Sequence, residues 1–346
     1  MVCETFCIDS TNLVVYNCIY EFLLNYTSVF DGKDKFSYMD RFITLVETAL
    51  PVFLALFMGA LCRKRNFITR DGVDTLKKVV INLTLPFVLF NAFATAEYSL
   101  SSIIIPVIVF AICCDALGLG FLTIKVFRIK SKLSPYLASG FEAGMLGFAL
   151  FALLFPNESI SKFAMLVLGQ ELFVFTLYKS MLTGKTSLKA IGKDVVTSPT
   201  LIAVMLGIVF GATGLYDLLG QWGVGGIIDS VTSFISAPTG MIILLTVGFD
   251  LVIREIPWKK TAGMIAMRLV VMGVLLGVLI LLNRTLLGGM IFEGAAVLLF
   301  ILPPPYVIPI FADEPDERVQ ISSSLSALTL ITMILFAVMS VVVNVA

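Results

Sequence analysis

The chain has 346 residues, of which 58% are hydrophobic and only 14% are charged, and its mean hydropathy is +1.00. Soluble domains have about a quarter of their residues charged, so this composition excludes a soluble enzyme, a disordered tail and a nucleic-acid-binding module. The 24 basic residues balance the 24 acidic ones, and there is no histidine, the commonest metal ligand. The composition therefore predicts an all-α integral membrane protein without a metal site or a cofactor.

Ten apolar runs follow one another along the chain, each near the roughly 20 residues that a helix needs to cross a bilayer. Their length, and the lack of a two-residue alternation, predict helices rather than strands. The predicted spans cover residues 42–62, 79–95, 102–124, 134–155, 163–183, 196–214, 231–252, 261–282, 288–311 and 322–345.

Positive charge is concentrated in every second loop between these runs. The basic loops hold 6, 4, 4, 3 and 1 Lys or Arg residues, whereas the loops between them hold 0, 1, 0 and 1. The long loop 215–230 carries no positive charge. The positive-inside rule places the basic loops in the cytoplasm, so we predict a multi-pass protein of the plasma (inner) membrane with both termini outside.

Residues 1–40 precede the ten-helix unit 41–346. The stretch 13–30 is apolar but is interrupted by Asn17, Glu21 and Asn25, and it has no basic residue on its N-terminal side. A secretory signal would need a positive n-region and a small-residue cleavage site. We predict an extracytoplasmic segment with an interfacial helix, and an eleventh span is the alternative.

Two predicted spans contain residues that interrupt a helix. The fourth includes the stretch 139–147, SGFEAGMLG, which has three glycines and the carboxylate Glu142. The ninth includes Pro303, Pro304 and Pro305, and three consecutive prolines cannot lie inside a continuous α-helix. The two spans are five apart in a chain of ten. This spacing predicts two inverted five-helix repeats whose broken helices 4 and 9 cross, an arrangement typical of the site of a secondary transporter.

Short motifs support this interpretation. The stretch 82–90, NLTLPFVLF, and the stretch 302–314, from LPPP to FADE, resemble motifs of the auxin efflux carrier family, which includes plant auxin carriers and bacterial malate permeases. The resemblance covers about residues 42–346. It implies a fold similar to sodium/proton antiporters and bile-acid symporters, with scaffold helices 1, 2, 6 and 7 and core helices 3–5 and 8–10. It also implies a possible homodimer through the scaffold helices.

The fourth span departs from the family pattern Asn-Thr-Gly-x-x-Gly-x-Pro. The glycines agree, but Glu142 stands in place of the asparagine that helps to hold substrate in the family, and Ala149 in place of the proline. The resemblance implies a substrate site at the crossing. Its expected residues are Glu142, Ala143, Gly144, Pro303, Pro304, Pro305 and, from the second span, Asn91.

Ionisable residues inside spans are costly and are therefore functional candidates. Glu142 lies about nine residues into its span, roughly 13 Å at the helical rise, which places it near the midplane. It is the first candidate for proton or ion coupling, with either H⁺ or Na⁺ as the coupling ion. Glu171 is a second candidate, and Asp115 could support them. Asp250 and Arg268 are interpreted as charges that satisfy each other near a hairpin end.

The sequence thus predicts a non-enzymatic permease that moves a small organic anion, such as malate, another dicarboxylate or an auxin-like carboxylate, by proton-coupled alternating access. The expected partners are this anion and the lipid bilayer, and no nucleic acid. The main alternative is a monovalent cation/proton exchanger with Glu142 as its ion site. A channel, and a protease with Asp115 and Asp250 as its dyad, are further alternatives.

Overall fold

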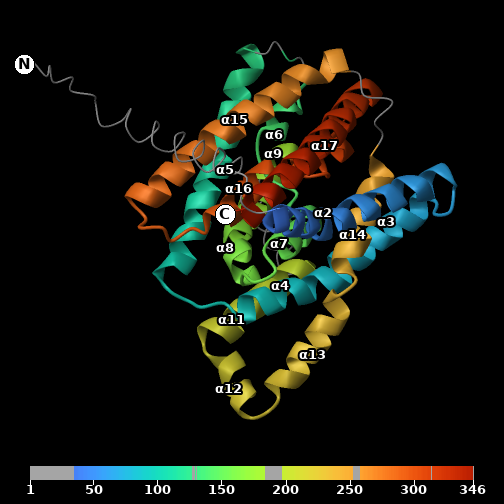
Figure 1. The fold of residues 1–346 in the computed structure, drawn as a ribbon. Helices are drawn as coiled ribbons and strands as arrows, with labels where there is room; N and C mark the ends of the chain where they lie inside the picture. Colours follow the sequence, from blue (N-terminus) through green and yellow to red (C-terminus); the bar gives the residue numbers. More distant parts are fainter. Residues whose placement is uncertain are drawn as a thin grey trace, which may run out of the picture.

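Figure 1 shows the fold in a computed structural model of the chain. The structure describes residues 35–126, 129, 131–183, 197–251, 258–312 and 314–345. Every regular element among these residues is helical, and they contain no strand. The all-helical fold predicted from the sequence is thereby confirmed. The predicted N-terminal segment lies outside the described residues, apart from residues 35–40.

The first three predicted spans form long helical runs. α2 (Lys35–Lys64) is followed by a run made of α3 (Arg70–Val79), the π-helical turn η1 (Val80–Thr84) and α4 (Leu85–Ala94). The Thr69 hydroxyl accepts a hydrogen bond from the Gly72 N–H and so caps α3. α5 (Leu100–Val126) is the third run.

The next two predicted spans differ in continuity. The fourth is divided into α6 (Ser134–Leu137), the π-helical turn η2 (Ala143–Gly147) and α7 (Phe148–Leu154). The fifth runs without a break through α8 (Ile160–Phe173), the π-helical turn η3 (Val174–Tyr178) and α9 (Lys179–Thr183). The Ser159 hydroxyl accepts from the Ser161 N–H at the start of α8.

The second half of the chain contains the remaining helices. These are α11 (Pro199–Ala212), α12 (Leu215–Gln221), α13 (Gly225–Ser236), α14 (Thr239–Asp250), α15 (Trp258–Thr285), α16 (Glu293–Ile301), the 3₁₀-helical turn η5 (Ile308–Phe311) and α17 (Pro315–Val345).

The stretch 215–230 is largely helical, so the prediction of a long loop was wrong there. α12 and the start of α13 occupy it, and the hydroxyl of Tyr216 donates to Asp229 across the turn between them. Lack of positive charge reveals the side of a membrane on which a segment lies, but it carries no information about helicity.

Six of the described helices are long and apolar enough to cross a membrane, and a seventh is counted if the bent pair α11 and α12 forms one span. The fourth and ninth predicted spans are absent from this set because their breaks leave pieces such as α7 and α16, with 7 and 9 residues. The described part of the chain therefore has six or seven helices suited to cross a membrane. The count of ten remains a prediction.

Glycines allow two helix pairs to pack closely. Gly59 of α2 lies against the backbone of α14 at Leu245, and Gly248 of α14 lies against the backbone of α2 at Leu56. Gly207 of α11 faces the backbone of α4 at Phe90 in the same way. Small residues at helix contacts are typical of packing in membranes, where close backbone approach replaces the hydrophobic effect as the driving force.

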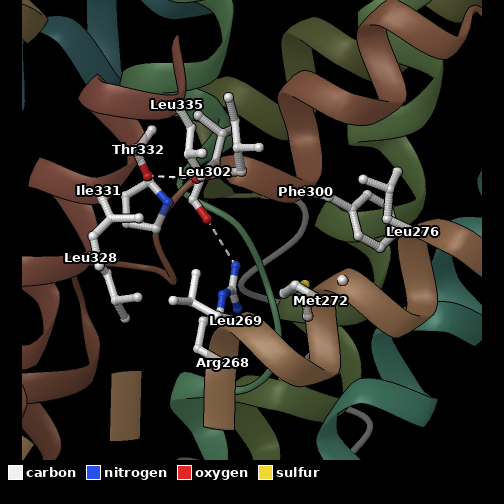
Figure 2. A pocket seen from close by; sticks show the side chains of 13 residues that line it. Arg268, Leu269, Met272, Leu276, Phe300, Leu302, Leu328, Ile331, Thr332 and Leu335 are labelled. Atoms are coloured by element: carbon white, nitrogen blue, oxygen red, sulfur yellow. Dashed lines mark hydrogen bonds between the residues drawn. The ribbon is translucent and has the colours of Figure 1, made fainter. Parts of the chain in front are cut away.

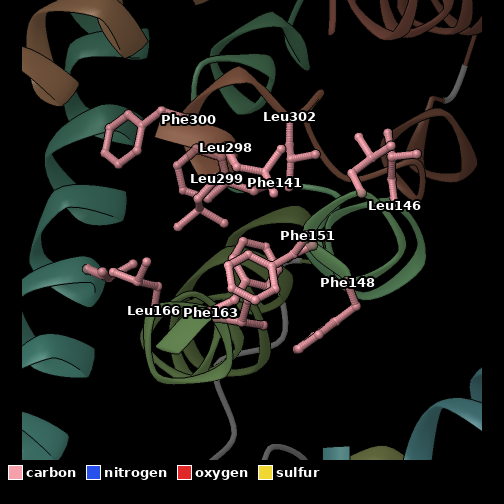
Figure 3. Packing of buried hydrophobic residues seen from close by; sticks show 14 of the residues in the cluster. Phe141, Leu146, Phe148, Phe151, Phe163, Leu166, Leu298, Leu299, Phe300 and Leu302 are labelled. Atoms are coloured by element: carbon pink, nitrogen blue, oxygen red, sulfur yellow. The ribbon is translucent and has the colours of Figure 1, made fainter. Parts of the chain in front are cut away.

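Aromatic residues fill the centre of the molecule around the two interrupted segments (Figure 3). Phe151 of α7 stacks on Phe163 of α8 at 5.1 Å between ring centroids, and Phe148 meets the same ring edge-on. Phe141 and Phe300, one from each interrupted segment, lie with their centroids 5.2 Å apart. This core holds α7, α8 and α16 together and so positions the breaks.

Candidate functional site

The fourth segment is interrupted between α6 and η2. Its helix ends at Leu137, and residues 138–142 continue without regular structure. Gly140 has a φ of 69°, in the left-handed region that only glycine adopts at little cost. Glu142, with φ −80° and ψ 58°, is the last residue before η2 begins. The glycine therefore permits the turn that places Glu142 at the N-terminal end of a helical piece.

The ninth segment is interrupted at the three prolines. α16 ends at Ile301, and Leu302 is extended, with φ −62° and ψ 149°, as expected for a residue before proline. Pro303, Pro304 and Pro305 are all buried, and helical structure resumes only at η5. Because none of the three can donate a backbone hydrogen bond, the helix cannot continue through them.

The two breaks contact each other directly. The Glu142 N–H donates to the Pro303 carbonyl at 2.8 Å, and the Glu142 carboxylate oxygen Oε2 accepts from the Tyr306 N–H at 2.7 Å. The Cα of Gly140 faces the ring of Pro305. Segments 160 residues apart in the sequence thus meet at a single crossing, with Glu142 bonded to both ends of the proline stretch.

A buried arginine of α15 ties the other ends of the breaks together, and Figure 2 shows its bond to one of them, at Leu302. Arg268 is only 2% exposed. Its Nη1 donates to the Leu137 carbonyl at 3.1 Å and its Nη2 to the Leu302 carbonyl at 3.0 Å. Its guanidinium also lies 5.2 Å from the centroid of the Phe141 ring. The positive charge therefore faces the carbonyl ends of α6 and α16, where a helix has its partial negative charge.

The sequence-based interpretation of Arg268 was wrong. Asp250, its expected partner, instead binds Arg70 and Lys77 of α3 at the end of α14. Arg268 lies deep in the core rather than near a hairpin end. The signal that could have found it is the one that selects Glu142, a charged residue inside an apolar run.

The other residues expected at the crossing lie at its edge. Ala143 is fully buried behind Glu142, and Gly144 faces Leu85, at the start of α4. Asn91 of α4 points inward, since its Oδ1 is buried, whereas Asn82 is exposed and donates to the Lys78 carbonyl. Of the two asparagines of the second predicted span, the structure thus turns only Asn91 inward.

Glu171 and its neighbour Gln170 lie at the level of Glu142. α8 runs antiparallel to η2 and α7, with Phe163 against Gly147 near its start and Tyr178 donating to the Tyr136 carbonyl beyond its end. Gln170 and Glu171 fall between these two contacts, as Glu142 does on the other segment. The two predicted coupling residues thus lie at a similar depth on neighbouring segments of the core.

Four buried side-chain oxygens of the described residues have no hydrogen-bond partner. They belong to Thr84, Asn91, Gln170 and Thr239. η1, which contains Thr84, contacts η2, and α14, which begins at Thr239, contacts both η2 and α7. α4, with Asn91, contacts α8, with Gln170. Buried polar atoms without partners are rare, so these four oxygens are candidate acceptors for hydrogen bonds from a guest.

Asp115 is not part of this arrangement. Its side chain is exposed on α5, whereas the Glu142 site lies inside the molecule. Cys113, two residues earlier on α5, does contact the break, because its carbonyl accepts from the Ser139 hydroxyl at 2.7 Å. Asp115 and Asp250 therefore do not form the dyad that a protease would need. No cluster of three or more His, Cys, Asp or Glu side chains suited to a metal occurs in the described part of the chain.

Comparison with known proteins agrees with this geometry. Residues 44–187, which include the first break, match the family model described as membrane transport protein. An uncharacterized transporter of Methanothermobacter thermautotrophicus (strain Delta H) is 25% identical over 221 residues, which cover 62% of this chain and 70% of that protein. The predicted resemblance to a family of membrane transporters is thereby confirmed over residues 44–187.

Proposed function

We propose that this protein, whose residues 44–187 match the family model described as membrane transport protein, is a secondary transporter that moves a small organic anion by alternating access. One observation carries the proposal: two interrupted helices meet at their breaks, with Glu142 bonded to both ends of the Pro303–Pro305 stretch. Crossed broken helices offer backbone groups without helical partners to a substrate at the middle of a membrane.

The proposed architecture has ten spans in two inverted repeats of five. Contacts between helices support the expected division into two parts. α2, the first predicted span, packs on α14, the seventh. α4, in the second span, packs on α11, in the sixth. All four belong to the expected scaffold. α5 contacts α8 and α15, and α16 contacts α8, all within the expected core. The partnerless oxygens of Thr84 and Thr239 lie on scaffold elements that face the crossing, as a substrate path between the two parts requires.

We propose that Glu142 couples transport to protons. Its carboxylate accepts the hydrogen bond of the Tyr306 N–H. A substrate carboxylate would use the same backbone donor. A proton on Glu142 would weaken this bond and remove the repulsion between two carboxylates, so that an anion could take its place. Glu171, at the same level of the core, is a second proton site in this scheme. Na⁺ in place of H⁺ is the alternative coupling ion.

The substrate proposed is malate, another dicarboxylate or an auxin-like carboxylate. A monovalent cation/proton exchanger is the second candidate function, and one observation favours it: the negative charge at the crossing belongs to the protein itself. We further propose a plasma (inner) membrane location, with both termini outside and homodimerisation through the scaffold helices.

Uptake into proteoliposomes tests these alternatives. We expect the purified protein to accumulate radiolabelled malate when an inward proton gradient is imposed, and to catalyse counterflow without one. Flux of sodium or potassium against protons, with no flux of malate or of indole-type monocarboxylates, would favour the exchanger. An ionic current across planar bilayers that flows without any exchange of substrate would contradict alternating access.

A further inference from the structure

A cavity of about 120 Å³ lies on the α15 and α17 side of the crossing, at the C-terminal end of α16 (Figure 2). Leu302 and Pro303, at the break of the ninth segment, form part of its wall. The described residues that line it include none from α2, α4, α11 or α14. The cavity is therefore separate from the elements that carry the partnerless oxygens of Thr84, Asn91 and Thr239.

The wall of this cavity is apolar, with two exceptions. Leu269, Met272, Phe300 and Leu328 are among the apolar residues. The hydroxyl of Thr332 already donates to the Ile301 carbonyl at 2.5 Å.

Arg268 is the other exception, and it is the only charged residue that lines the cavity within the described chain. A guanidinium has five N–H donors, and the hydrogen bonds of Arg268 go to two main-chain carbonyls. No carboxylate of the described residues forms an ion pair with it. A buried charge is normally paired, so this guanidinium is suited to an anionic guest.

The cavity reaches an exposed apolar face of α15. Leu269 is 43% exposed, and Gly273, one turn further along α15, is also exposed. Beside them, Val270 and Val274 expose 53% and 57% of their surface. In a membrane protein this apolar face is covered by lipid chains. A guest could thus reach Arg268 from the hydrocarbon layer without passing through the crossing.

We propose that this cavity binds a small apolar monocarboxylate that enters from the bilayer, with its carboxylate on Arg268 and its apolar body between α15 and α17. The volume is close to that of an engineered cavity of about 150 Å³ that binds benzene, which limits the body to one ring or a short branched chain. The bound anion would hold Arg268 on the Leu137 and Leu302 carbonyls. It would thus stabilise the crossing as a regulator, separate from the transported substrate.

Benzoate is the probe for this site. Its binding to the purified full-length protein is measured by calorimetry and by the shift in melting temperature, next to neutral benzamide and the dicarboxylate succinate. We expect saturable binding of benzoate, with both other compounds at least about tenfold weaker, because benzamide lacks the charge and succinate lacks the apolar body.

Two glycines of α15 provide a matched pair of variants. A Cβ at either Gly273 or Gly277 meets no atom within 4 Å, so a larger side chain is accommodated at both positions. Only Gly273 lines the cavity. We expect Gly273→Leu to weaken benzoate binding at least about tenfold, and Gly277→Leu to leave it unchanged.

Arg268→Lys separates charge from shape. It keeps the charge but loses the planar fork, and we expect intermediate affinity. Absence of benzoate binding would overturn the proposal, as would equal affinities of Gly273→Leu and Gly277→Leu. Benzamide binding as tight as benzoate would show an apolar cavity without an anion site. The comparison of Gly273→Leu with Gly277→Leu distinguishes this cavity from the crossing, because only Gly273 lines the cavity.

Discussion

Glu142 and Arg268 engage opposite ends of the same two interrupted segments. The Glu142 carboxylate accepts from the Tyr306 N–H beyond the proline stretch, whereas Arg268 donates to the Leu137 and Leu302 carbonyls before the two breaks. Glu142 thus lies where backbone N–H groups lack helical partners. Arg268 lies where backbone carbonyls lack them. Since unpaired backbone groups are costly inside a membrane, the two charges make the crossing possible.

Replacement of Glu142 by glutamine tests the coupling role. The change keeps the size of the side chain and removes its titrating proton, so we expect malate uptake to lose its stimulation by an inward proton gradient. The measurement is initial uptake into proteoliposomes over a series of external pH values. Glu158→Gln is the matched control, because Glu158 forms an ion pair with Lys162 outside the crossing. Unchanged pH dependence in Glu142→Gln would transfer the coupling role to Glu171.

Replacement of Pro303, Pro304 and Pro305 by alanine tests the need for a break. The triple variant regains three backbone donors and removes the restriction on the residues before them, so we expect a more continuous helix and loss of transport. Circular dichroism measures the gain in helix, and uptake measures the loss of function. Pro106→Ala is the control, because α5 continues through Pro106. Wild-type uptake in the triple variant would contradict the crossing as the transport site.

Gly140 and Gly144 should differ in their tolerance of alanine. A Cβ at Gly140 would lie 3.0 Å from Pro305 Cγ, and the φ of 69° disfavours any side chain by roughly 1–2 kcal/mol. A Cβ at Gly144 would lie at an ordinary 3.5 Å from Leu85 Cδ2. We expect a lower melting temperature for Gly140→Ala than for Gly144→Ala in detergent. Equal melting temperatures would mean that the turn at Gly140 relaxes without cost.

Arg268→Gln should strongly destabilise the protein. It removes a buried charge and leaves two main-chain carbonyls without full partners, each at a cost of about 1–3 kcal/mol. Arg284→Gln, near the other end of α15, breaks an exposed ion pair with Glu293 and should cost about 1 kcal/mol or less. Thermal unfolding in detergent compares the two. Similar melting temperatures would show that Arg268 is not needed to hold the crossing.

Much of the local structure follows from the sequence alone. The long apolar runs specify helices because a backbone in lipid must satisfy its own hydrogen bonds. The breaks are also local properties: prolines at 303–305 lack N–H donors, and Gly140 accepts a left-handed turn. Glu142 stood out because a charge inside an apolar run is costly. Each of these conclusions needs only a residue and its near neighbours.

Only the tertiary structure decided which charged and polar groups form hydrogen bonds or ion pairs with one another. Arg268 bonds to carbonyls 131 and 34 residues away, and Asp250 to side chains 180 and 173 residues away. Packing of α4 against α8 and α11 determined that Asn91, and not Asn82, points inward. The sequence determined where the helices exist and where they break, because those are local energies. The partners of the charges depend on contacts between distant segments, which no local pattern records.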